Sequence, residues 1–177
     1  MRRISIALLA LVGLFASAAQ ANSLAQTLND LYLEDQQDKQ SGAYSYYRDQ
    51  QRLESVQALL ENNRLTQAKE YYHAAVIFQH GSRSEHYRRA HTLALEAVRL
   101  EPGFMEARWL ACAAEDRYLH SLGKPQVWGT QQRFTGSWTL EPFDRSAKSD
   151  RERQANGVSN LEAIDSHIET LNGTELK

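Results

Sequence analysis

The stretch EDRYLHSLGKPQVWGTQ, residues 115–131, decides how this chain folds. It begins inside an alanine-rich helical pattern that three consecutive charges, residues 115–117, interrupt. The helix is predicted to end at Gly123. Pro125 and Gly129 then favour a tight turn, because proline fixes φ and glycine permits a close backbone approach. Charges with apolar neighbours one helical turn away, followed by a polar turn, indicate a shaped polar pocket at this point.

The chain before this stretch has the pattern of successive helices. Apolar residues recur every three or four positions, and capping residues and Gly, Pro or Asn breaks separate the segments. The first expected helix begins at Ser23 and has a frayed or solvated end over residues 34–43, and the second covers Tyr46–Asn62. The third runs from a Thr66 cap to a left-handed cap at Gly81, and the fourth from a Ser84 cap to Pro102-Gly103. The fifth covers Met105–Leu122. Short connections make the last three antiparallel neighbours.

After Gly123 the periodicity changes. Two aromatic-rich segments, residues 128–134 and 137–143, flank Thr135-Gly136 and predict a small β-hairpin. Two more helices are expected, each opened by a capping box: a short one from Ser149-x-x-Glu152 to Gly157 and a terminal one from Ser159-x-x-Glu162 to Gly173. The predicted fold class is therefore mainly α, with packed antiparallel helical hairpins that are helical-repeat-like and a small β-hairpin near the C-terminal third.

Residues 1–21 have the features of a cleavable secretory signal. Arg2 and Arg3 precede an apolar run, which ends in the small-x-small cleavage pattern Ala19-Gln20-Ala21. The run is short for a membrane span. We therefore expect a periplasmic or secreted protein, cut after Ala21, with no stable membrane insertion after signal cleavage.

Residues 22–177 are long enough to form one mainly helical domain with its own core. The helices of residues 22–65 are expected to be more variable, and residues 66–172 to contain the core, the hairpin and the closing helix. Without the signal, 18 of the 20 basic residues remain against 22 acidic ones, a net charge of −4. This balance argues against a nucleic-acid partner. The single cysteine, Cys112, lies among apolar residues and is expected to be buried and inert.

Several chemistries lack their sequence signatures. No His-x3-His or Cys-x2-Cys pair suggests a metal site, and no Gly-x-Ser-x-Gly or phosphate loop appears. We therefore predict no metal and no cofactor.

Four residues on the helices could serve a site. His91 lies on an apolar stripe, where it is either a structural residue with paired ring nitrogens or a pocket-lining one. His80 either caps its helix or donates to an anion or carbonyl. Asp116 and Arg117 either bridge neighbouring helices and the 125–131 turn, or Arg117 presents its planar fork to a carboxylate or phosphate.

The turn adds Gln126, Thr130 and Gln131, which offer hydrogen-bond donors and acceptors. They could hold a neutral polar ligand, and they are equally suited to anchoring the hairpin onto the helices.

Five strings resemble an uncharacterised bacterial family that is known only as a domain of unknown function. They are Ala74–Gly81 (AAVIFQHG), Ala90-His91-x-Leu93-Ala94, Asp116-Arg117-x-Leu119, Gly123-x-Pro125-Gln126-x-x-Gly129-Thr130-Gln131 and Trp138-x-Leu140-Glu141-Pro142. The resemblance covers about residues 71–161 and implies a helical fold with an unnamed role. The positions that match the family's polar motif are Gln79, His80, His91, Asp116, Arg117, Gln126, Thr130 and Gln131. The pairing of the helices over residues 84–122 also resembles about one and a half tetratricopeptide units, without a 34-residue repeat.

Three functions fit these residues. The first is a helical binding or interaction module for a peptide, a protein or a small polar ligand. The second is a hydrolase or lyase, in which His80 or His91 acts as general base, oriented by Asp116 and assisted by Arg117. The third is a purely structural polar cluster that locks the hairpin onto the helices. The sequence leaves open whether the protein is an enzyme.

Overall fold

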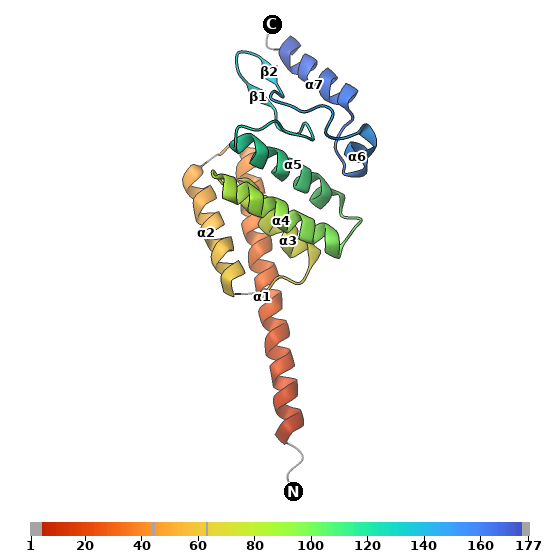
Figure 1. The fold of residues 1–177 in the computed structure, drawn as a ribbon. Coiled ribbons are helices and arrows are strands. Elements are labelled where there is room, and N and C mark those ends of the chain that lie inside the picture. Colours follow the sequence, from red (N-terminus) through yellow and green to blue (C-terminus); the bar gives the residue numbers. More distant parts are fainter. Residues whose placement is uncertain (1–4, 44, 63, 175–177) are drawn as a thin grey trace. The chain divides into compact units, whose positions relative to one another are not determined.

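A computed structural model describes the backbone of residues 5–43, 45–62 and 64–174, and side chains in these ranges from residue 23 onward. Residues 1–4 of the predicted signal lie outside it. The chain divides into two compact units, Met1–Leu65 and Thr66–Lys177. The elements, labelled in Figure 1, are α1 (Ser5–Ser41), α2 (Tyr46–Asn62), α3 (Ala68–Gln79), α4 (Ser84–Leu100), α5 (Met105–Ser121), β1 (Arg133–Phe134), β2 (Trp138–Thr139), α6 (Asp150–Ala155) and α7 (Leu161–Thr174). The predicted mainly helical fold is confirmed.

The first unit is a pair of helices joined by ion pairs. Helix α1 continues to Ser41, so the fraying predicted for residues 34–43 is wrong, whereas the alternative of a solvated helical face holds for Glu34, Gln37 and Gln40. Asp35 and Asp38 are buried there, because the buried Arg52 of α2 approaches both carboxylates. Arg52 Nη1 lies 2.8 Å from Asp38 Oδ2, and Nε lies 3.7 Å from Asp35 Oδ1.

Replacing Arg52 by methionine should lower the free energy of unfolding by about 3–5 kcal/mol, because two buried carboxylates lose a cation. Chemical denaturation measures this loss. Arg48→Met is the matched control. The exposed Arg48 pairs with Asp38, with 2.9 Å between Arg48 Nη1 and Asp38 Oδ1, so its replacement should lower the free energy of unfolding by less than about 1 kcal/mol. Equal losses in the two variants would contradict this account.

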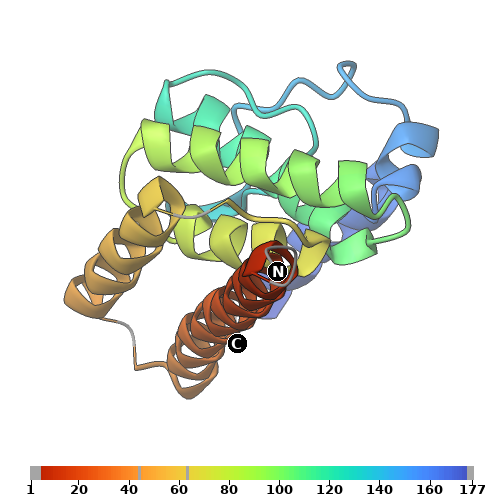
Figure 2. The same ribbon diagram turned by 90° about the horizontal axis from the view of Figure 1, so that it is seen from below.

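In the second unit, α3, α4 and α5 pack against one another, and Figures 1 and 2 show them as neighbours. Small side chains make this close approach possible. The fully buried residues of these helices include Ala74, Ala75, Ala90, Ala94, Ala97, Ala107 and Ala114. On α4, the buried stripe consists of Ala90, Ala94 and Ala97.

Three helix ends differ from prediction. Helix α3 begins one residue later than expected, because the Glu70 carboxylate accepts the backbone N–H groups of Thr66 (2.7 Å) and Gln67 (2.9 Å). Ser84 is the first residue of α4 rather than its cap. Gly81 does not have the predicted left-handed conformation. It is needed for space, because a Cβ there would lie 2.4 Å from His86 Nδ1.

The hairpin is much shorter than predicted. Only Arg133 with Thr139 and Phe134 with Trp138 pair as antiparallel strands, and residues 128–132 form a loop instead. The capping box of Ser149 and Glu152 is confirmed at α6.

At α7, the predicted capping box of Ser159 and Glu162 is replaced by Asn160, whose side chain accepts the N–H of Ala163 at 2.9 Å. Gly173 lies inside α7 rather than after it.

Among the helices of the described chain, none is both long and apolar enough to cross a bilayer.

A buried histidine makes the second unit sensitive to acid. His73 of α3 is 3% exposed, and burial, helped by the charge of Lys69, lowers its pKa from 6.5 to about 4. The unfolded chain therefore binds a proton in the window between pH 6.5 and 4 that the folded chain does not. This contribution to stability is complete above pH 6.5 and falls as the pH drops toward 4.

Between pH 7 and pH 4.5 the wild-type protein should lose about 2 kcal/mol more unfolding free energy than His73→Gln, which has no titrating ring. Urea denaturation at the two pH values measures the difference. Identical pH dependence in both proteins would show that His73 titrates alike in the folded and unfolded chains.

Candidate functional site

One buried carboxylate holds the loop that follows α5. Asp116 is fully buried on α5, and both of its oxygens accept hydrogen bonds from residues 127–130. Its Oδ1 accepts the N–H groups of Val127 (2.7 Å) and Trp128 (2.9 Å), and its Oδ2 accepts the N–H (3.0 Å) and the hydroxyl (2.8 Å) of Thr130. Four donors compensate the buried charge, so the loop is fixed against α5.

Gln126 closes the same loop from inside. Its side chain is buried, and its Oε1 accepts the N–H of Gln131 at 2.9 Å. Its Nε2 donates to the carbonyl oxygens of Gln131, at 2.9 Å, and Leu140. The Gln126 amide therefore joins both ends of the loop to the segment that leaves the hairpin.

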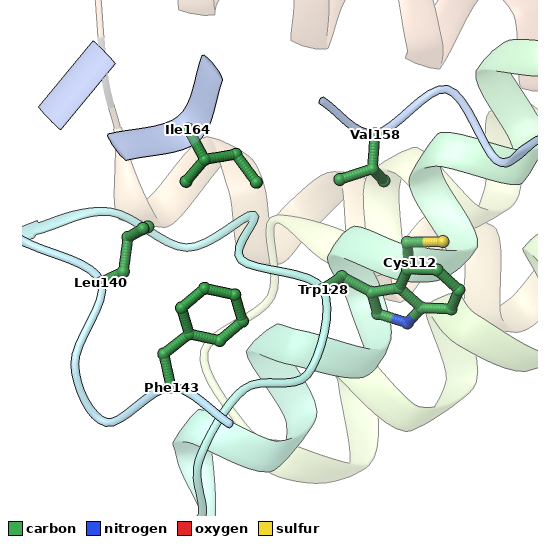
Figure 3. Packing of buried hydrophobic residues seen from close by; sticks show 6 residues of the cluster. All are labelled: Cys112, Trp128, Leu140, Phe143, Val158 and Ile164. Atoms are coloured by element: carbon green, nitrogen blue, oxygen red, sulfur yellow. The ribbon is translucent and has the colours of Figure 1, made fainter. Parts of the chain in front are cut away.

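Apolar side chains cover the other side of the loop. Figure 3 shows Trp128, Leu140, Phe143, Val158 and Ile164 gathered around it, with Trp128 beside Cys112 of α5. Gly129 has φ +82°, and a Cβ there would lie 2.8 Å from Phe143 Cζ, so only glycine fits. The buried Arg153 of α6 donates to the carbonyl of Trp128 and completes this packing.

The substitution Asp116→Asn should lower the free energy of unfolding by about 2–5 kcal/mol, because the amide nitrogen must face backbone N–H donors. Chemical denaturation provides the measurement. Glu115→Gln is the neighbouring control: Glu115 accepts only the Trp128 indole N–H, at 2.7 Å, and an amide oxygen can replace it at a cost below about 1 kcal/mol. A loss for Asp116→Asn no larger than for Glu115→Gln would overturn this role.

Arg117 links α5 to α3 and to the loop. Its Nη1 donates at 2.8 Å to the backbone carbonyl of Gln79, one of the last-turn carbonyls that α3 leaves without a helical partner. Its Nε donates at 3.0 Å to Gln131 Oε1, and its Cζ lies 5.8 Å from the centre of the Tyr87 ring. Burial lowers the pKa of the guanidinium, yet arginine keeps its charge in proteins.

This cation has no acidic partner. Within the described ranges, no carboxylate pairs with Arg117, and its Nη2 has no hydrogen-bond partner. Arg117 is half-buried, and only neutral acceptors and a ring contact its charge, so the protein compensates that charge incompletely. The arrangement therefore favours an additional anion.

Arg117 lines an open cleft of about 310 Å³. The other residues of this Arg117 cleft are Ser82, Tyr87, His120, Ser121, Gln131, Gln132 and Arg133. No carboxylate is among these described lining residues, so the cleft is positively charged. Arg133 Nη1 lies 3.1 Å from His120 Nε2. Because arginine can only donate, His120 Nε2 can only be the acceptor in this pair.

The predicted site residues divide into groups. Asp116, Gln126 and Thr130 use their polar atoms to hold the loop. Arg117 and Gln131 come together at the cleft, where Gln131 also donates to the Ala113 carbonyl at 3.2 Å. Gln79 takes part through its backbone rather than its side chain.

The two histidines lie elsewhere. His80 is the C-cap residue of α3 and is not among the lining residues of the Arg117 cleft. His91 lines a separate hollow of about 150 Å³ with Cys112, Glu115 and Trp128, and its Nδ1 lies 2.9 Å from the Ala111 carbonyl. The loop donors occupy both oxygens of Asp116, so the geometry does not provide the histidine–Asp116 pair that the enzyme hypothesis requires.

Other reactive chemistry finds little support. The Cys112 thiol is buried, and desolvation together with the nearby carboxylates Asp116 and Glu115 raises its pKa to about 12, which keeps it protonated. Within the described chain, no group of three or more His, Cys, Asp or Glu side chains is arranged to hold a metal ion.

Sequence reasoning missed most of the cleft's polar residues, among them His120, Ser121 and Arg133. His120 and Ser121 lie three and four positions after Arg117 and therefore share its face of α5. Arg133 follows Gln131 by two positions, the spacing that returns an extended chain to the same side. Both spacings were visible in the sequence, but nothing in it showed that the two segments face each other.

Comparisons of the chain with protein families, with curated proteins and with solved structures found no match.

Proposed function

We propose that this protein is a helical binding module that takes a small anionic ligand, with a carboxylate or phosphate group, in the Arg117 cleft. One observation carries the proposal: a half-buried guanidinium without a carboxylate partner borders an open cleft with a second arginine. The signal-like residues 1–21 suggest that binding takes place in the periplasm or outside the cell.

The cleft has the size and the donors for such a ligand. Its volume of about 310 Å³ lies at the small end of known ligand sites. Arg117 supplies N–H groups in a planar fork, and Ser82 and Ser121 add hydroxyl groups. A carboxylate or phosphate would therefore receive charge-assisted hydrogen bonds.

The structural hypothesis predicts something different. In that case Arg117 serves only to hold Gln79 and Gln131 through its hydrogen bonds. Replacing Arg117 would then lower the free energy of unfolding without affecting the binding of a ligand. Stability and binding must therefore be measured separately.

Wild-type protein should bind inorganic phosphate or acetate in isothermal titration calorimetry. Arg117→Met should weaken this binding about tenfold or more, because a charge-assisted contact is lost. Arg133→Met should weaken it several-fold without changing the fold, because Arg133 is exposed. Circular dichroism checks that each variant is folded.

Arg89→Met is the matched control, because Arg89 is an exposed α4 residue that does not line the cleft. It removes the same charge and should leave anion binding unchanged. If neither anion binds the wild-type protein, or if Arg89→Met and Arg133→Met weaken binding equally, the proposed site is wrong.

A further inference from the structure

A second hollow adjoins the Arg117 cleft. It has a volume of about 160 Å³ and lies between the loop, α5 and α7. Its walls include Leu140, Val158 and Ile164, three members of the apolar cluster drawn in Figure 3. Its described lining contains no Asp, Glu, Lys or Arg. We call it the apolar hollow.

The size of the apolar hollow suits one ring. A dry protein cavity of about 150 Å³ is known to hold benzene. The exposed Trp109 stands at the hollow as an aromatic neighbour, and Ser159 and His167 provide polar atoms in its lining. A flat six-membered ring with apolar faces is therefore the occupant that fits it.

Gln132 belongs to both the apolar hollow and the Arg117 cleft. Next to it in the sequence, Thr130 lines the hollow, whereas Gln131 and Arg133 line the cleft. Gln132 is exposed, and no described residue bonds to its side-chain amide. The hollow and the cleft therefore share one exposed polar side chain.

We propose that the ligand of this protein is a small aryl acid, whose anionic group binds in the Arg117 cleft and whose ring binds in the apolar hollow, with Gln132 at the crossing. This inference rests on the proposed function and specifies its ligand class. The charged end is recognised by the guanidinium of Arg117, which has no carboxylate partner among the described residues, and the ring by the apolar walls. Gln132 would lie beside the linker that joins the ring to the anionic group.

The test is a length series of aryl acids: benzoate, phenylacetate, 3-phenylpropionate and 4-phenylbutyrate, compared with acetate by calorimetry. At least one of them should bind about tenfold or more tightly than acetate, because a buried ring adds apolar contact. Arg117→Met should remove most of this binding.

Filling the hollow separates the two sites. Ala163 lines the hollow from an exposed position of α7, so Ala163→Phe should occupy the ring site without breaking the core. With this substitution, the aryl acid should bind no more tightly than acetate, and acetate binding should be unchanged. Ser166 is also exposed on α7 but does not line the hollow, so the aryl acid should still bind more tightly than acetate in Ser166→Phe.

The outcomes distinguish the two proposals. If acetate or phosphate binds through Arg117 and no aryl acid binds more tightly, the aryl-acid inference fails and the anion site stands. If the aryl acid still binds more tightly than acetate in Ala163→Phe, the inference is also wrong, because the ring then lies elsewhere. If no anion binds at all, the proposed function fails as well.

Discussion

The second unit depends on the buried charge of Asp116. A carboxylate inside a protein is tolerated only when donors surround it, and here four hydrogen bonds come from three residues of one short loop. Asp116 lies on α5, which packs against α3 and α4, so its hydrogen bonds hold the loop in a fixed position on these helices. The position of Gln131 beside Arg117, and of Gly129 against Phe143, follows from this attachment.

The loop in turn creates two unlike environments on its two sides. On one side, Arg117 lacks an acidic partner and faces a cleft with His120 and Arg133. On the other side, Leu140, Val158 and Ile164 line the apolar hollow, whose described lining has no Asp, Glu, Lys or Arg. Neighbouring residues of the loop border the two sites: Thr130 lines the apolar hollow, Gln131 lines the Arg117 cleft and Gln132 lines both. The proposed ligand follows from that geometry.

The same attachment explains why the hairpin prediction was too long. The aromatic residues after Gly123 have the composition of strands, and composition was the basis for predicting paired segments at 128–134 and 137–143. In the structure, the N–H groups of Val127, Trp128 and Thr130 bond to a side chain, which leaves them unavailable to a partner strand. Pairing therefore survives only at residues 133–134 with 138–139, beyond the reach of Asp116.

The sequence by itself determined the helices, because apolar spacing and breakers such as Pro102-Gly103 act locally, and it selected Asp116, Arg117 and the 126–131 turn as belonging together. Only the tertiary structure decided what each does. Asp116 and Gln126 became internal anchors, His91 was directed to a separate hollow, and Arg117 met His120, Arg133 and Tyr87. Hydrogen-bond partners and unpaired charges are properties of packed segments distant in sequence, so residue type and spacing could identify the polar groups but could not assign their partners.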